Sequence, residues 1–226
     1  MVSRALLPLL QLSDSAFPTG SFSHSLGLEA LVASRAVRDE TTLEAAIDDY
    51  LVALSTSDCA ALRGAAEAGC LERIIALDRA LAATKLARES RAASAATGAS
   101  LLASIAALEI DDAQLSAYHA AVHDDATPGS HAIAYGLVTR AFGIDAGEAV
   151  TAYTYAAAAG LVAAGQKLLP IGQRAAQSVL FRLHDLIALS VEVSSAVDTA
   201  DPFAFAPVTE IASMSHERQQ TRLYIS

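Results

Sequence analysis

The chain of 226 residues contains no tryptophan, only two cysteines and six prolines, and aromatic residues make up 5% of it. Two cysteines cannot build a disulfide scaffold, and so few aromatic residues give strands little to pack with, which excludes a β-sandwich. Charged residues are also scarce, at 18% against 53% hydrophobic residues, a balance that excludes intrinsic disorder. Alanine, the best helix former, fills 51 positions. The composition therefore predicts a helical protein of one large domain or two small ones.

Positive charge is especially scarce. Fifteen Lys and Arg face 25 Asp and Glu, which gives a net charge of −10, and the only lysines are Lys85 and Lys167. Nucleic acids and anionic lipids require a basic surface, so we expect neither a nucleic acid nor a membrane as the main partner. The densest cationic run is Lys85, Arg88 and Arg91, and its helical spacing indicates a solvated helix face rather than an anion site.

Enzyme signatures are missing. The sequence has no GxxxxGK[ST] phosphate loop, no GxGxxG, no HExxH and no GxSxG. Cys59 and Cys70 lack the CxxC spacing of a zinc site, and we interpret them as buried or idle thiols of a reducing compartment, not as a disulfide or a zinc site. These absences give no indication of catalysis, and we expect no cofactor and no metal site formed by the cysteines.

One long stretch lacks charge altogether. Between Glu148 and Lys167 lie 18 uncharged residues, AVTAYTYAAAAGLVAAGQ, which is the lower limit for a membrane span. Alanine contributes little to transfer into lipid, and small residues around Gly160 and Gly165 favour a buried central helix with close neighbours instead. Pro8 interrupts the apolar stretch at the N-terminus, so we expect no secretory signal and a cytoplasmic protein.

Several local signals predict helix boundaries. Thr41 and Glu44 have the spacing of a capping box, Asp145 suits the start of a later helix, and Gly143 suits the end of the helix before it. The segment IGQRAAQSVLFRLHDLIALSVEV has the clearest helical period, whereas DTADPFAFAP is predicted to be an extended connector.

No span alternates convincingly enough to predict a strand. We therefore predict an all-α fold, a single-domain bundle of about eight to ten helices. The predicted domain covers residues 1–207, and residues 208–226 form a C-terminal tail.

A polar segment near the N-terminus, SDSAFPTGSFSHSLGLE, combines turn residues with hydroxyl groups. Ser21 or Ser23 could cap a helix there. Asp14, Ser23 and His24 have the side chains of a hydrolase triad, but adjacent Ser and His at a helix start point in different directions, and nothing supplies an oxyanion hole. We interpret the segment as a capping turn or as a surface that a partner recognises.

The histidines offer one candidate metal site. His119 and His123 are four residues apart on a predicted helix, which is the spacing of metal ligands, and Asp124 and His131 follow closely. A structural or solvated role is also common for histidines at a helix end. His184 lies within the predicted helix of clearest period and is interpreted as a core or interface residue.

The C-terminus is unusually apolar for a chain end. Leu223, Tyr224 and Ile225 follow Arg218 and Arg222. Large apolar side chains at a terminus dock either on the chain's own body or on a partner, and arginine with aromatic residues is typical of interface anchors. The residues alone leave both alternatives open.

Five segments resemble the family of urease accessory proteins named UreF. They occur in the family's order, and they are LLQLSDSAFPTGSFSHSLGLEAL (9–31), KLARESR (85–91), HAIAYGLVTRAFGID (131–145), LLPIGQ (168–173) and IASMSHERQQTRLYIS (211–226). The resemblance implies an all-helical, cytosolic, non-enzymatic adaptor for nickel delivery that forms homodimers. Its implied partners are the accessory protein UreD, called UreH in some organisms, the GTPase UreG and, through the complex, apo-urease.

The resemblance also implies two partner-binding regions. The tail is expected to contact the UreD-type protein through Met214, His216, Glu217, Arg218, Arg222, Leu223 and Tyr224. The N-terminal segment, facing the GTPase or the nickel route, contributes Ser13, Asp14, Phe17, Pro18, Gly20, Phe22, Ser23, His24 and Glu29. Leu223 and Tyr224 are expected to gain burial only in the complex.

Two other functions remain open at this point. The chain could carry nickel through His119 and His123, or it could regulate the activity of the partner GTPase. The alanine-rich middle, residues 92–127, matches the family only in its helical character, so the resemblance does not support metal handling by His119 and His123.

Overall fold

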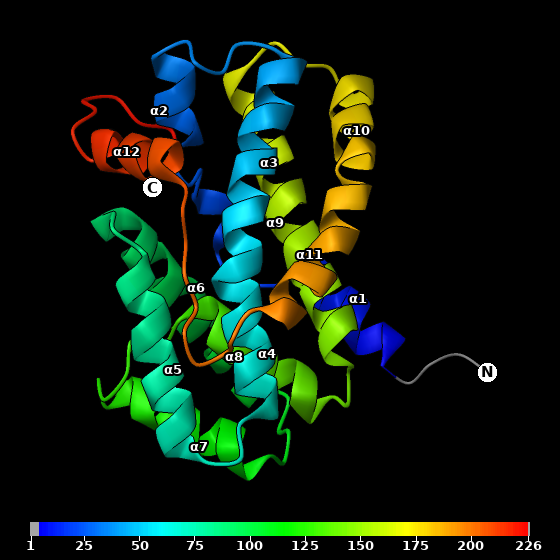
Figure 1. Ribbon diagram of the computed structural model, residues 1–226, viewed down its shortest axis with the longest axis vertical. Coiled ribbons are helices and arrows are strands. Elements are labelled where there is room, and N and C mark those ends of the chain that lie inside the picture. Colours follow the sequence, from blue (N-terminus) through cyan, green and yellow to red (C-terminus); the bar gives the residue numbers. More distant parts are fainter. Residues whose placement is uncertain (1–4, 226) are drawn as a thin grey trace.

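The computed structural model describes residues 5–225, and these form an all-α bundle without a strand, which confirms the predicted fold class (Figure 1). One turn of 3-10 helix, η1 (Ser21–Ser23), lies near the N-terminus. The α-helices within the described residues are α1 (Leu6–Ser13), α2 (Leu28–Ala33), α3 (Glu40–Thr56), α4 (Asp58–Glu67), α5 (Leu71–Thr84), α6 (Arg88–Ala106), α7 (Ala113–His123), α8 (His131–Ala141), α9 (Ala146–Leu168), α10 (Gln173–Arg182), α11 (His184–Ala196) and α12 (Pro207–His216).

Two predicted helix boundaries are confirmed around the turn between α8 and α9. Gly143 has φ +70°, and the amides of Gly143 and Ile144 bond back to the last carbonyls of α8, including that of Thr139. This is the left-handed ending for which glycine is favoured. Asp145 then starts α9, because its carboxylate accepts the amide of Gly147 at 2.8 Å.

Two other boundaries differ from the prediction. The capping box of α3 is formed by Asp39 and Thr42, not by Thr41 and Glu44: the Asp39 carboxylate accepts the Thr42 amide at 2.9 Å. The helix therefore begins earlier. The single helix predicted after residue 170 is instead two helices, α10 and α11, with a bend between them at Leu183. The Leu183 side chain is fully buried in the core.

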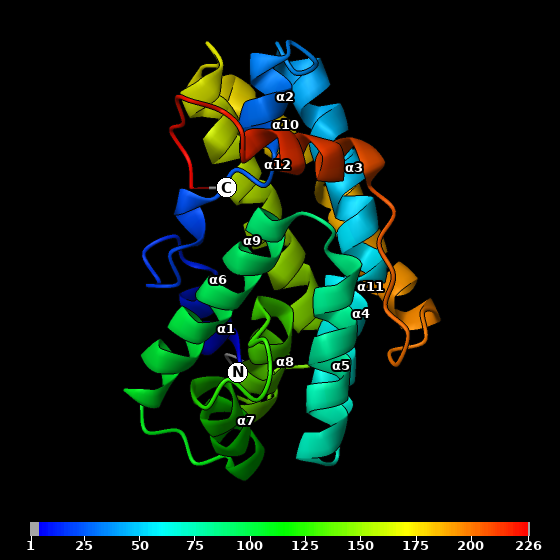
Figure 2. The ribbon, with the colours of Figure 1, turned by 90° about the vertical axis from the view of Figure 1, so that its left-hand side faces the viewer.

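The uncharged run predicted to be a buried helix lies in α9, which packs against α3, α4, α8, α10 and α11 (Figures 1 and 2). Gly165 lies against Leu43 of α3, so close that a Cβ atom would fall 2.5 Å from a Leu43 methyl carbon. Gly160 differs from the expectation, because a Cβ there would meet nothing within 4 Å. Among the helices of residues 5–225, none combines the length and apolarity needed to cross a membrane.

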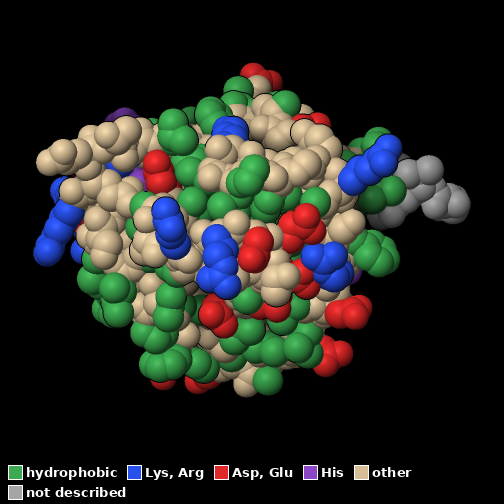
Figure 3. Space-filling model, turned by 90° about the horizontal axis from the view of Figure 1, so that it is seen from above, with side chains coloured by type: hydrophobic (Ala, Val, Ile, Leu, Met, Phe, Trp, Pro, Cys, Tyr) green, Lys and Arg blue, Asp and Glu red, His purple; other side chains and the backbone are tan. Residues whose placement is uncertain are grey.

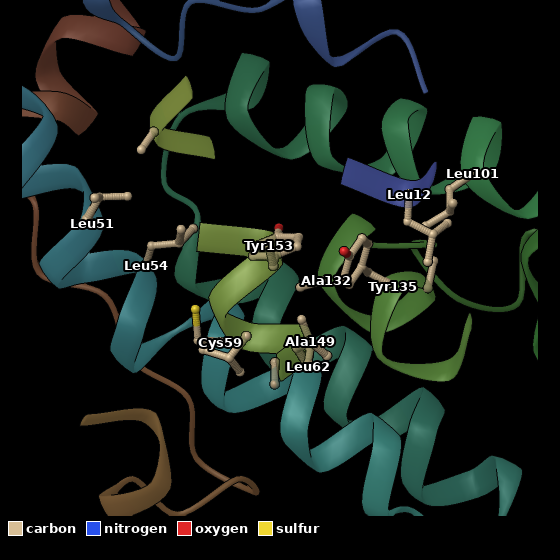
Figure 4. Packing of buried hydrophobic residues seen from close by; sticks show 14 of the residues in the cluster. Leu12, Leu51, Leu54, Cys59, Leu62, Leu101, Ala132, Tyr135, Ala149 and Tyr153 are labelled. Atoms are coloured by element: carbon tan, nitrogen blue, oxygen red, sulfur yellow. The ribbon is translucent and has the colours of Figure 1, made fainter. Parts of the chain in front are cut away.

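Helices α4 and α8 pack closely against each other, and a glycine permits it. A Cβ atom on Gly136 would lie 2.4 Å from the carbonyl oxygen of Leu62, in the backbone of α4. Around this crossing the core is built of leucine, isoleucine and alanine, with the rings of Tyr135 and Tyr153 side by side, their centroids 5.3 Å apart (Figure 4). Small residues thus let the backbones approach, as the alanine content indicates.

A buried carboxylate joins α5 to the loop before α8. Asp78 is fully buried, and it accepts hydrogen bonds from the Tyr118 hydroxyl, the Thr127 hydroxyl and the amides of Gly129 and Ser130, at 2.7–3.0 Å. These bonds fix the turn from which α8 begins.

The C-terminal helix α12 lies beside α2 and also contacts α3 and α6 (Figures 1 and 2). The extended connector predicted before it, DTADPFAFAP, contains no helix over residues 198–206. The predicted boundary at residue 207 thus coincides with the start of α12, but the helix is packed onto the body. Residues 1–4 and 226 of the two predicted ranges lie outside the described residues.

Candidate partner-binding site

The two end motifs, far apart in sequence, meet in space. The buried side of α12 consists of Ala212, Ser213 and His216, and it faces α2. Gly27, just before α2, has φ +87°, and a Cβ there would lie 2.8 Å from the Ser213 hydroxyl oxygen. Glycine is therefore required at this position both for its backbone conformation and for the close approach of α12.

Glu29 of α2 is the centre of this contact. Its side chain is buried, with the residue only 8% exposed. One carboxylate oxygen accepts the amide of Leu223 at 2.8 Å, and the other accepts the amide of Tyr224 at 3.1 Å and lies 3.0 Å from Nε2 of His216. Burial alone would raise the pKa of Glu29, but these hydrogen bonds outweigh it, so the net pKa is lowered.

A second carboxylate, Glu89 of α6, completes the cluster. One of its oxygens lies 2.7 Å from Nδ1 of His216, and the other accepts Nη1 of Arg222 at 2.7 Å. His216 is fully buried between the two carboxylates. Nearby, Glu210 of α12 accepts the amide of Ala87 at 2.8 Å and so caps the start of α6. We call Glu29, Glu89 and His216 the tail latch.

The cationic run is only partly the solvated helix face that its spacing indicates: Arg88 and Arg91 are exposed on α6, whereas Lys85 lies between α5 and α6. Lys85 ends α5, and its ammonium group forms a 2.6 Å ion pair with the buried Asp58. Arg88 pairs with Glu217 of the tail at 3.2 Å, and Arg91 donates to the carbonyls that precede α6. The helix breaks inside the run, so its cations point to different partners.

Beyond the latch, the same segment exposes large apolar side chains. Leu223 is 73% exposed, Ile225 68% and Ile211 63%. In contrast Tyr224 is only 6% exposed, and Lys167 lies over its ring at 5.5 Å. The expectation that Tyr224 gains burial only in a complex is therefore wrong. We define the tail surface as the exposed side chains of Val208, Ile211, Met214, Leu223 and Ile225.

The N-terminal candidates are placed around one irregular segment. Phe22 is exposed in η1, and the carbonyl of Ser23 accepts the amide of Ile225 at 2.9 Å, so this segment borders the tail. Phe17 packs on the core, Asp14 and Pro18 are exposed, and Ser13 donates to the Leu9 carbonyl. Gly20 has φ +75°.

The predicted serine cap of the next helix is misplaced. Ser21 and Ser23 lie in η1, whereas α2 begins only at Leu28, after a further turn. The Ser25 hydroxyl is the group that accepts the Glu29 amide, at 3.4 Å. Gly20 directly precedes η1 and Gly27 directly precedes α2, and both have positive φ angles. The chain therefore makes two turns before α2, where the sequence predicted a single serine cap.

A cavity of about 330 Å³ lies behind the tail, between α6, α8 and α9, and Tyr224 and His24 are among its lining residues. The Tyr135 hydroxyl is buried there outside hydrogen-bond geometry with any described group. Burial lowers the pKa of His24, against the opposing effect of Glu89, and lowers the pKa of His131 to about 4. Polar and charged side chains thus line part of the cavity wall.

The predicted pair His119 and His123 lies on α7, one helical turn apart. His123 pairs with Asp124 at 3.2 Å on the surface, and within residues 5–225 no three His, Cys, Asp or Glu side chains are grouped so as to hold a metal ion. His131 lines the cavity instead. His184 is not a core residue: it is exposed beside Phe181, with ring centroids 5.2 Å apart.

The surface that includes the upper ends of α2, α3, α10 and α12 mixes both signs of charge with hydrophobic side chains (Figure 3). Of the three latch residues, sequence reasoning singled out Glu29 and His216 but missed Glu89, whose place in a charged run resembles that of an ordinary surface residue. No local signal could have paired Glu89 with a histidine 127 residues away.

Comparison with known proteins gives a consistent result. The model of the UreF family matches residues 37–184. The chain is 38% identical over 221 residues to the urease accessory protein UreF of Paenarthrobacter aurescens, covering 97% of both chains. It is 37% identical over 222 residues to the UreF protein of Actinobacillus pleuropneumoniae, covering 96% of this chain and 97% of the relative. The UreF protein of Kocuria rhizophila is 34% identical over 227 residues, with 98% and 97% covered.

Proposed function

The chain belongs to the UreF family of urease accessory proteins, and we propose that it is a non-enzymatic adaptor which joins a UreD/UreH-type protein to the GTPase UreG. In this role it would position the GTPase for GTP-dependent nickel insertion into apo-urease, in the cytoplasm. The proposal assigns the tail to the UreD-type partner and the adjoining N-terminal segment to the GTPase.

The observation that carries this proposal is that the polar and the apolar groups of the tail have different surroundings. Its polar groups bind the body of the protein through the tail latch, while the large side chains of the tail surface remain exposed. Exposed apolar side chains gathered on one segment mark protein interaction sites, and burying each would contribute roughly 1.5–3 kcal/mol. Met214 and Leu223 are therefore direct contacts in this proposal, whereas the buried Glu29, His216 and Tyr224 support them.

The test is co-purification with a UreD-type and a UreG-type protein. We expect Ile211→Asp and Leu223→Asp to abolish capture of the UreD-type partner, because each places a charge in the apolar contact. Leu108→Asp is the matched control, since Leu108 is exposed outside the tail surface, in the turn after α6. Undiminished binding by both tail variants, or by a chain truncated after Pro207, would refute the assignment.

Homodimerisation is also part of the proposal, and one surface favours it. Tyr155 of α9, Phe181 of α10, His184 and Leu189 of α11 are exposed, and the His184 ring lies within 6.4 Å of the Tyr155 and Phe181 ring centroids. A second copy offers the same aromatic surface, which allows ring-on-ring contact across a twofold axis. We expect Phe181→Asp to be monomeric in sedimentation equilibrium; an unchanged dimer would place the interface elsewhere.

The nickel carrier stays the alternative from another functional class. It is tested by titrating Ni²⁺ into the chain in a calorimeter and repeating the titration with His119 and His123 replaced by alanine. A tight site lost in that variant would favour the carrier over the adaptor. GTPase regulation is tested separately, by measuring GTP hydrolysis of the UreG-type partner with and without this chain.

A further inference from the structure

The described residues of the tail after α12 form no helix or strand. After α12 ends at His216, the chain forms only turns and bends through residue 225. Such a segment loses conformational entropy when it is fixed, so an interface built on it is weakened unless something fixes it in advance. The question is which groups hold it.

Two carboxylates of the body accept hydrogen bonds from three successive residues of this segment. Glu29 accepts the backbone amides of Leu223 and Tyr224, and Glu89 accepts the side chain of Arg222. The two bonds to Leu223 and Tyr224 are donated by backbone amides. They therefore fix the path of the main chain whatever side chains these two positions carry. Both carboxylates contact His216, which ties the end of α12 to the same point.

The direction of successive side chains follows from this path. Tyr224 is turned inward and buried, whereas Leu223 and Ile225 on either side of it are exposed. The amides of Leu223 and Tyr224 are both held by Glu29, and in the bend that results only the Tyr224 side chain faces the body. The amide of Ile225 is also bound, by the carbonyl of Ser23, which extends the ordered path past Tyr224.

His216 has a special place because both of its ring nitrogens face carboxylate oxygens, at 2.7 and 3.0 Å. Carboxylates only accept hydrogen bonds, so the ring makes both bonds only when it carries a proton on each nitrogen. Arg222 binds the other oxygen of Glu89, so a cation also holds this carboxylate in place. Such charge-assisted bonds are stronger than neutral ones.

We propose that Glu29, Glu89 and His216 are positioning residues, which hold the tail in its binding conformation before a partner arrives and do not themselves contact that partner. This inference rests on the proposed function in one respect: pre-ordering the tail is expected to raise affinity for the UreD-type protein. The holding itself is a property of the isolated chain and can be measured without any partner.

The first test uses Glu29→Gln and amide hydrogen exchange of the isolated chain, followed by NMR. A carboxamide replaces one acceptor oxygen by an NH₂ donor, so at least one of the three bonds to Glu29 is lost. Loss of one charge-assisted bond corresponds to roughly tenfold faster exchange at Leu223 and Tyr224. Glu192→Gln, an exposed glutamate of α11, is the matched control and should leave exchange unchanged. Unchanged exchange in Glu29→Gln would overturn the latch.

The second test separates positioning from general stability. Glu29→Gln should weaken binding of the UreD-type partner by roughly tenfold in the full chain, but by clearly less in a chain ending at Gln220, which keeps His216 and lacks Leu223 and Tyr224, whose amides Glu29 holds. Faster exchange with unchanged affinity, or an equal loss in the truncated chain, would refute positioning. Should Glu29→Gln fail to fold, Glu89→Gln in the longer helix α6 serves for the same measurements. If the unaltered chain binds no such partner, the proposed function fails, while the exchange experiment still decides the latch.

Discussion

Asp78 offers the sharpest test of how the body of the bundle is held together. Its carboxylate is fully buried and accepts four hydrogen bonds, three on Oδ2 from Tyr118, Thr127 and Gly129, and one on Oδ1 from Ser130. Asparagine can keep its oxygen in the Oδ2 position and retain three bonds, but its NH₂ group then faces the Ser130 amide. The Ser130 amide then lacks its acceptor and faces another donor, which costs about 2 kcal/mol.

Alanine at the same position removes all four acceptor contacts. Four buried donors then lack partners, and relaxation of the loop offsets part of the loss, so we expect a cost of about 4 kcal/mol. Since domains of this size are stable by roughly 5–15 kcal/mol, Asp78→Ala should be severely destabilised and Asp78→Asn clearly so. A larger loss of stability in Asp78→Ala than in Asp78→Asn is what we expect of one acceptor that binds several donors.

The assay is urea unfolding followed by far-UV circular dichroism, with stability taken from the midpoint and slope of the transition. Asp111→Asn is the control, because Asp111 is exposed before α7. A loss below about 0.5 kcal/mol in Asp78→Asn, equal to that of an ordinary surface change, would refute the reasoning.

Three further predictions concern the core, the thiols and pH. Gly136→Ala should cost about 2 kcal/mol in the same urea assay, because the added Cβ would lie 2.4 Å from the Leu62 carbonyl oxygen and force α4 and α8 apart; an unchanged midpoint would contradict this packing. Ellman's reagent should titrate one thiol in the folded protein and two in urea, since Cys70 is exposed whereas burial raises the pKa of Cys59 to about 12; two fast thiols in the folded state would be contrary. Burial lowers the pKa of His131 from 6.5 to about 4, so the unfolded chain binds this proton more readily; stability should fall by up to about 3 kcal/mol as pH drops from 6.5 to 4, and His131→Phe should lose that component of the pH dependence.

Features that depend on short stretches of chain could be predicted from the sequence. The α9 helix follows from 18 uncharged residues rich in alanine, and its start at Asp145 follows from one side chain that bonds amides two and three residues on. The start of α3 was misplaced because two pairs with capping-box spacing overlap there, and only the relative position of Asp39 and Thr42 in space decides between them. The bend at Leu183 likewise leaves the helical period intact, so the period cannot reveal it.

The site was predictable only in part, for a related reason. Its residues were singled out one segment at a time, but their mutual arrangement depends on contacts between α2, α6 and α12, which a single sequence does not encode locally. This is why Glu29, His216 and Tyr224 were expected at a partner's surface and are instead buried against one another.

The separation in sequence between the two halves of the latch also bears on the order of folding. Glu29 and His216 are 187 residues apart, so their contact closes almost the whole chain into one loop. Closing so large a loop is entropically unfavourable until the intervening helices have brought its ends together, whereas the contacts within α4, α5 and α8 span much shorter loops. The tail should therefore dock last during folding, and it should be the first unit to open under native conditions while the bundle beneath it stays folded.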